Sequence, residues 1–143
     1  MAAVPGADHD IYAALVDAAA QARDEEGLRT YAPLAEESAA SVEHRLDLGI
    51  AHRAWGVAHT LKGEYAQAEQ RLRKALEFFE SYPAPWQIGR TWFELGELWQ
   101  KRGETAKSRE SYGKALEAFE TLKAAPDVAR TRLALESLGG RPS

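Results

Sequence analysis

The stretch GRTWFELGELWQKRGETAKSRESYGKAL, residues 89–116, decides the fold because it repeats the stretch GIAHRAWGVAHTLKGEYAQAEQRLRKAL, residues 49–76. The two copies lie 40 residues apart and share their glycines and the run Lys-Ala-Leu-Glu, which begins at Lys74 and again at Lys114. A period of this length is typical of proteins built from stacked structural units. The repeat therefore predicts a solenoid whose role is to present a surface to partners.

Glycine and proline divide the chain into segments of helical length. Gly27, Gly63 and Gly103 are expected in the short turns within helix pairs, and Pro83 between two pairs. No stretch alternates apolar and polar side chains at a period of two, so we expect no β-sheet. The helices predicted in this way are 9–25, 28–42, 45–62, 65–81, 86–102, 105–122 and 127–138.

The fifth of these helices has the clearest core stripe. Trp92, Leu95, Gly96 and Trp99 fall on one face at spacings of three and four residues. Gly96, like Ala115 in the next helix, is small, and we expect the two helices to cross closely there. A larger side chain at such a contact would force the helices apart.

These residues resemble the tetratricopeptide repeat (TPR) family. The family pattern of a tryptophan, a Leu-Gly pair and an aromatic residue stands at residues 92–99, WFELGELW. The pattern of its second helix stands at residues 108–116 and, one repeat earlier, at residues 68–76. The 40-residue unit is longer than the common one of about 34 residues. It is similar to the repeats of kinesin light chain and of the sensor tails of bacterial transcriptional activators.

The resemblance implies a right-handed α-solenoid of about three TPR helix pairs and a C-terminal capping helix. We expect one domain over 9–138, with residues 1–8 disordered and 139–143 flexible. The first pair departs most from the pattern, and Pro33 either begins its second helix or kinks it. The repeats are expected at about 9–43, 44–83 and 84–124, with the capping helix at 127–138.

The composition argues against a membrane protein and against a nucleic-acid-binding protein. The chain has 143 residues, of which 45% are hydrophobic and 28% charged, and it contains no cysteine. It shows neither a long apolar run nor a signal peptide, so we expect a cytoplasmic protein without a membrane partner. The net charge of −4 combines an acidic first 50 residues with a slightly basic remainder. No concentrated basic stripe indicates binding to nucleic acid.

The pattern of polar residues predicts no enzyme, no cofactor and no metal site. No phosphate-binding loop, nucleophile elbow or catalytic triad is present. His52 and His59 lie two helical turns apart, roughly 10 Å, which is too far to share one zinc ion. We therefore expect these two histidines to be packing residues. His9 and His44 lie elsewhere in the sequence and indicate no definite site.

The resemblance also places a binding surface, because the first helices of TPR pairs line a concave groove that commonly holds a peptide. On the third helix this face is apolar, which left two interpretations open: it is covered by neighbouring helices, or it forms the floor of the groove. The residues predicted to line the groove are Ile50, Arg53, Val57, Leu61, Arg90, Phe93, Glu94, Glu97, Lys101 and Arg130.

We therefore expect a non-enzymatic protein–protein interaction scaffold that binds a protein or peptide segment in this groove. The alternative is a small-molecule-sensing or regulatory module of a bacterial signalling or transcription system. An exposed apolar groove could also be closed by a second copy of the chain, which would make a homodimer.

Overall fold

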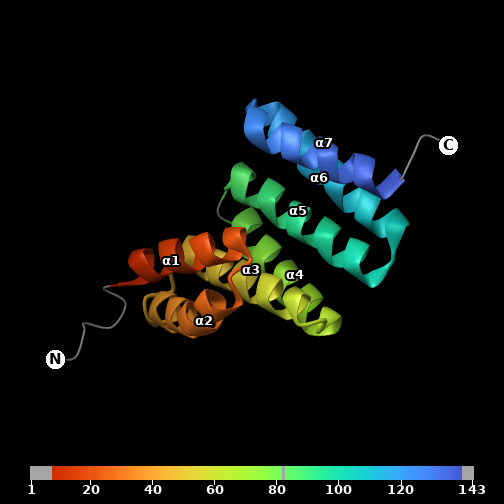
Figure 1. Cartoon of the computed structure of the whole chain (residues 1–143). Coiled ribbons are helices and arrows are strands. Elements are labelled where there is room, and N and C mark those ends of the chain that lie inside the picture. The colour runs from red at the N-terminus through yellow and green to blue at the C-terminus, as the bar shows by residue number, and fades with distance from the viewer. Residues whose placement is uncertain (1–7, 82, 140–143) are drawn as a thin grey trace. The chain divides into compact units, whose positions relative to one another are not determined.

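The computed structural model describes residues 8–81 and 83–139. All the regular structure in these ranges is helical and no strand occurs in them, so the prediction of an all-α protein is confirmed. Figure 1 labels the helices along the chain. They are α1 (His9–Ala22), α2 (Glu25–Ser41), α3 (Arg45–Leu61), α4 (Tyr65–Ser81), α5 (Pro85–Arg102), α6 (Thr105–Leu122) and α7 (Ala125–Gly139).

The two predicted flexible ends fall almost entirely outside the described residues. Of the N-terminal segment 1–8 only Asp8 is described, and it precedes α1 as its N-cap residue. Of the C-terminal segment 139–143 only Gly139 is described, and it ends α7. The predictions of disorder and flexibility for the other residues therefore stay predictions.

The turn between α1 and α2 differs from the sequence prediction. Gly27 lies inside the first turn of α2, where its amide donates a hydrogen bond of 3.1 Å to the Asp24 side chain. The chain reverses earlier, at Arg23, which adopts a left-handed conformation with φ of 55°. Pro33 lies in the interior of α2, so the interpretation that it begins this helix is wrong. The start of α2 is therefore set by its N-cap residue, Asp24, and not by Gly27.

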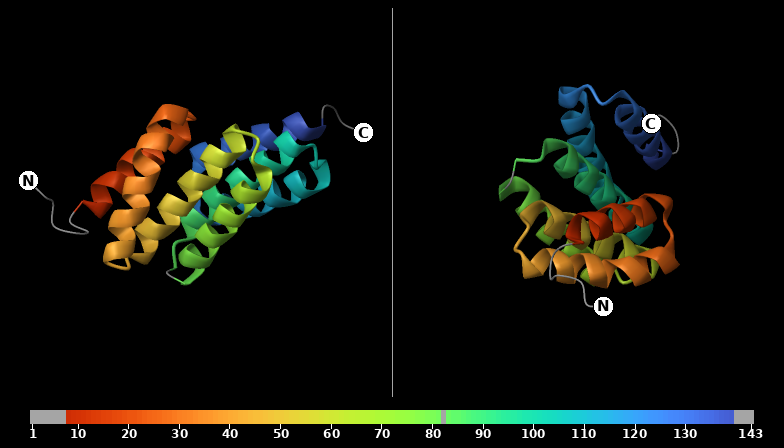
Figure 2. Two further views of the ribbon diagram at one scale, coloured as in Figure 1. Left: turned by 90° about the horizontal axis from the view of Figure 1, so that it is seen from below. Right: turned by 90° about the vertical axis from the view of Figure 1, so that its left-hand side faces the viewer.

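The chain divides into two compact units, residues 1–83 and 84–143. The division falls between the second and third predicted repeats. In the first unit, α3 packs against α1, α2 and α4, and Figure 2 shows these four helices lying close together. The buried cluster of this unit is aliphatic and consists of Val16, Ala19, Ala20, Leu28, Ala32, Ala35, Ala51, Ala54 and Val57.

In each of the helix pairs α3–α4 and α5–α6, the two helices are in close contact at a glycine. A Cβ atom added to Gly56 of α3 would lie 2.5 Å from the Leu72 side chain of α4. A Cβ atom added to Gly96 of α5 would lie 2.5 Å from the Tyr112 ring of α6. The Ser108 hydroxyl also donates a hydrogen bond of 2.6 Å to the Gly96 carbonyl. The predicted close crossing at Gly96 is confirmed.

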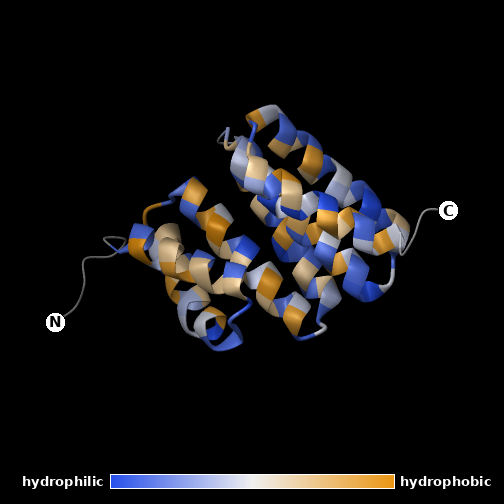
Figure 3. Ribbon diagram, turned by 45° about the horizontal axis from the view of Figure 1, so that its top comes forward, coloured by the Kyte–Doolittle hydropathy of each residue, from blue (hydrophilic) through white to orange (hydrophobic). Residues whose placement is uncertain are grey.

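The second unit is an α5–α6 hairpin covered by α7. Its buried cluster contains Phe93, Tyr112, Ala115 and Phe119. Apolar side chains of α7, among them Val128, Leu135 and Leu138, pack against this cluster. Every helix in Figure 3 carries polar as well as apolar residues. Among the described residues, none of the helices combines the length and apolar character needed to cross a lipid bilayer.

Candidate functional site

The predicted apolar groove floor on α3 is instead part of the core of the first unit. Only 2% of the Val57 surface is exposed, and Ile50 and Leu61 pack against the cluster to which it belongs. Besides α3 itself, the helices that supply residues to this cluster are α1 and α2. Of the two interpretations left open by the sequence, burial by neighbouring helices is therefore confirmed, and an open floor at Val57 is wrong.

Arg53, predicted to line the groove, is the largest fully buried side chain among the described residues. Its guanidinium donates a hydrogen bond of 3.1 Å to the Asp17 carboxylate of α1. The same group lies 5.2 Å from the centre of the Phe79 ring of α4. A buried cation is tolerated where it is paired, so Arg53 joins α1, α3 and α4 and is not available to a partner.

The predicted groove residues of the second unit divide into two sets. Arg90, Phe93 and Glu94 are buried, and Phe93 packs edge-on against the Tyr112 ring at 5.2 Å between ring centres. Glu97 is half-buried. The exposed members are Lys101 and Arg130.

Two contacts between α5 and α7 show that Lys101 and Arg130 lie on neighbouring helices. The Arg130 guanidinium lies 5.0 Å from the centre of the Phe93 ring, and the Gln100 amide donates a hydrogen bond of 3.3 Å to the Ser137 hydroxyl. The two helices therefore run side by side in the same direction over this length. Leu133, between the two contacts on α7, is 66% exposed. We call Glu97, Lys101, Arg130 and Leu133 the α5–α7 face.

The two histidines of α3 have the packing roles predicted for them. The Arg71 guanidinium donates hydrogen bonds of 2.9 Å to the Glu36 carboxylate and 3.1 Å to Nδ1 of His52. The other Glu36 oxygen accepts a hydrogen bond of 2.8 Å from the Trp55 indole. His59 Nδ1 lies 2.7 Å from the Glu64 carboxylate. His52 therefore belongs to a polar network that links α2, α3 and α4.

This network predicts an acid-sensitive first unit. Burial lowers the pKa of the His52 imidazole below its ordinary value of 6.5, against the opposing effect of the Glu36 carboxylate. The unfolded chain then binds more protons than the folded chain below about pH 6.5, so stability is lost as the pH falls through this value. We expect the free energy of unfolding to drop less between pH 7 and pH 5 in His52→Gln than in the wild type. Chemical denaturation at several pH values measures this, and equal drops would contradict the prediction.

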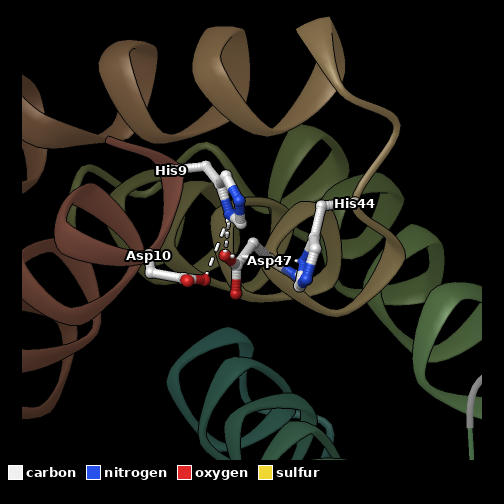
Figure 4. A group of neighbouring side chains, drawn as sticks. All are labelled: His9, Asp10, His44 and Asp47. Atoms are coloured by element: carbon white, nitrogen blue, oxygen red, sulfur yellow. Dashed lines mark hydrogen bonds and ion pairs between the residues drawn. The ribbon is translucent and has the colours of Figure 1, made fainter. Parts of the chain in front are cut away.

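A second group of polar side chains lies where α1 and α3 begin. His9 and Asp10 open α1, while His44 and Asp47 lie at the start of α3, and all four point toward one another in Figure 4. Nδ1 of His9 lies 2.5 Å from Oδ2 of Asp47 and 3.1 Å from Oδ1 of Asp10. Nδ1 of His44 lies 3.5 Å from Oδ2 of Asp47. One possible ligand atom from each residue lies within 4.8 Å of the other three.

We call His9, Asp10, His44 and Asp47 the His–Asp cluster. Its two carboxyl groups differ in their exposure to solvent. The Asp47 side chain is only 6% exposed, whereas that of Asp10 is 77% exposed. Burial raises the pKa of Asp47, and its hydrogen bond with Asp10 adds to the rise. The same hydrogen bond lowers the pKa of Asp10. The two carboxyl groups therefore do not ionise independently, because two adjacent carboxylates repel each other.

Sequence reasoning missed this cluster because its halves are 34 residues apart. Each half is a short pair at the start of a helix, His9-Asp10 and His44-x-x-Asp47. Neither pair offers enough ligands for a metal site, and no spacing rule joins them. The only available signal was that each pair opens a helix and that the two helices occupy equivalent places in their repeats.

The described residues form an all-α protein in which the α3–α4 and α5–α6 hairpins each pack closely at glycines. Neither a known protein family nor a curated protein matches the sequence. The geometry of the two units is therefore the basis for assigning a function.

Proposed function

We propose that the chain is a non-enzymatic protein–protein interaction scaffold of the TPR kind, whose helix pairs stack into a right-handed α-solenoid. The observation that supports this proposal is that the glycines repeated in both copies make equivalent contacts with the neighbouring helix. Gly49 and Gly89 contact the rings of Phe79 and Phe119, just as Gly56 and Gly96 contact Leu72 and Tyr112. The positions common to both repeats are thus occupied in contacts within the hairpins, which leaves recognition to exposed positions at which the copies differ, such as Lys101.

The binding surface in this proposal is the α5–α7 face. It contains Lys101 and Arg130, the exposed members of the predicted groove, in which Arg53, Val57, Arg90 and Glu94 are buried. Its two basic groups, Lys101 and Arg130, lie about eight residues apart along parallel helices, which corresponds to roughly 12 Å. The Arg130 guanidinium also donates a hydrogen bond of 2.7 Å to the Asp127 carboxylate, so Lys101 is the main basic group for a partner. The exposed Leu133 side chain lies between the two basic groups. Such a surface suits an extended segment with acidic residues flanking an apolar one.

Co-purification with a double variant tests this proposal. The full-length chain is used as bait, and bound proteins are identified by mass spectrometry. Lys101→Glu with Leu133→Asp reverses one charge and adds another at the centre of the face. The matched control, Arg109→Glu with Leu122→Asp, makes the same changes at exposed positions of α6. Circular dichroism confirms that both variants keep their helices.

We expect a partner that is retained by the wild type and the control but bound at least tenfold more weakly by the Lys101→Glu, Leu133→Asp variant. That loss corresponds to about 1.4 kcal/mol, which one apolar contact and one charge pair can supply. Equal retention by all three proteins would exclude this face. A specific metabolite that raises the melting temperature, with no protein retained, would favour the sensing alternative.

A further inference from the structure

The His–Asp cluster carries an inference beyond partner binding, and its ligand set is the first part of the argument. Two imidazoles and two carboxylates offer two nitrogen and at least two oxygen ligands. The chain has no cysteine to compete with them. Imidazole ligands suit Zn²⁺, Cu²⁺ and Ni²⁺, whereas Mg²⁺ and Ca²⁺ prefer sites made of oxygen atoms alone.

The possible ligand atoms of the cluster are close enough to converge on one small ion, since all lie within 4.8 Å of one another. Zinc binds nitrogen and oxygen at about 2.0–2.2 Å, so the ligand atoms of a tetrahedron lie about 3.3 Å apart. The separation of 3.1 Å between Nδ1 of His9 and Oδ1 of Asp10 is close to this value. Nδ1 of His44 accepts a hydrogen bond of 3.3 Å from the Asp47 amide, which leaves Nε2 of His44 as its ligand atom. The contact of 2.5 Å between His9 and Asp47 has to lengthen by less than about 1 Å.

Charge supplies the second part of the argument. Asp47 is a carboxyl group with only 6% of its side chain exposed, and Asp10 and the two imidazoles surround it. A carboxylate oxygen of each residue lies within 4.8 Å of the other, so the two negative charges repel each other. A divalent cation placed between them neutralises both carboxylates at once.

We propose that His9, Asp10, His44 and Asp47 bind one Zn²⁺ ion, which fastens the start of α1 to the start of α3. The tetrahedral preference of Zn²⁺ selects it over Cu²⁺ and Ni²⁺, which favour tetragonal arrangements. The exposed Asp10 gives the ion a path from solvent. Because the ligands come together only when α1 docks on α3, the ion stabilises the docked helix.

Isothermal titration calorimetry of the full-length chain, free of any affinity tag, with Zn²⁺ tests this site. Three variants are compared with the wild type: Asp10→Asn, His9→Gln and the control His59→Gln. His59 lies on α3 and bonds to Glu64 outside the cluster, so it matches the chemistry of the His9 change. The Asp10→Asn variant changes an exposed side chain and keeps the test valid if His9→Gln disturbs the fold.

We expect one Zn²⁺ per chain in the wild type and in His59→Gln. The two cluster variants should bind at least tenfold more weakly, since even groups that only support metal ligands change affinity by about 10–100-fold. Co²⁺ in place of Zn²⁺ should give the strong visible absorption of a tetrahedral site, and Mg²⁺ should give no heat. The proposal is overturned by an absence of Zn²⁺ binding, by wild-type affinity in Asp10→Asn, or by one ion shared between two chains.

Discussion

Val57→Asp is expected to unfold the N-terminal unit. Val57 is 2% exposed and lies in the aliphatic cluster formed by α1, α2 and α3. Removing it forfeits about 1.5–3 kcal/mol of buried apolar surface. A carboxyl group left in the same place adds a desolvation cost of several kcal/mol or must take up a proton. The total of about 4 kcal/mol or more is a large part of the stability of a typical domain, about 5–15 kcal/mol.

Urea denaturation followed by circular dichroism measures this loss. Val42→Asp serves as the matched control, because it makes the same substitution in the same unit at a side chain that is 46% exposed. We expect its free energy of unfolding to change by less than about 1 kcal/mol. A Val57→Asp protein as stable as Val42→Asp would show that α1 does not cover α3 as described.

Gly96→Leu is expected to separate α5 from α6. A Cβ atom at this position meets the Tyr112 ring at 2.5 Å, and Tyr112 is itself only 1% exposed, so the ring has no free space into which it can move. Overpacking of this kind typically costs about 1–3 kcal/mol, and leucine adds three further carbon atoms to the clash. We therefore expect a loss at or above the upper end of that range.

Gly113→Leu provides the comparison for Gly96→Leu within the same hairpin. Gly113 lies in the interior of α6, is exposed, and has nothing within 4 Å of an added Cβ atom. Because leucine favours helix more than glycine does, this variant should gain up to about 1 kcal/mol. Thermal unfolding of the two variants should therefore shift in opposite directions. Shifts of the same sign and size would contradict the close crossing at Gly96.

The helices could be predicted well because their signals are local. The bounds 65–81 and 105–122 were predicted as the structure shows them for α4 and α6. Gly63 and Gly103 mark the turns before these helices, and both adopt left-handed conformations, with φ of 77° and 83°. Glycine adopts such angles without strain, so its position is informative about a turn. At Gly27 the same signal failed, because Asp24 capped the helix three residues earlier.

Which of the predicted groove residues are exposed could be predicted only in part, because burial depends on neighbours distant in sequence. The apolar face of α3 around Val57 has the same pattern whether a partner covers it or α1 does. The first repeat, which supplies that cover, is the one that departs most from the pattern. The His–Asp cluster was beyond prediction for a related reason: His9 meets Asp47 across 38 residues, and only the docking of α1 on α3 brings them together.

Because the chain has two units with separate buried clusters, its thermal unfolding can show more than one transition. A chain with two cores does not have to lose them in one cooperative step, and its unfolding is then described by two midpoints. Trp55 belongs to the first unit, and Trp92 packs against the cluster of the second. Trp55 is the single tryptophan of the first unit, so replacing it with phenylalanine would assign the remaining fluorescence signal to the transition of the second unit. Zn²⁺ should then move the transition of the first unit and leave the second where it was.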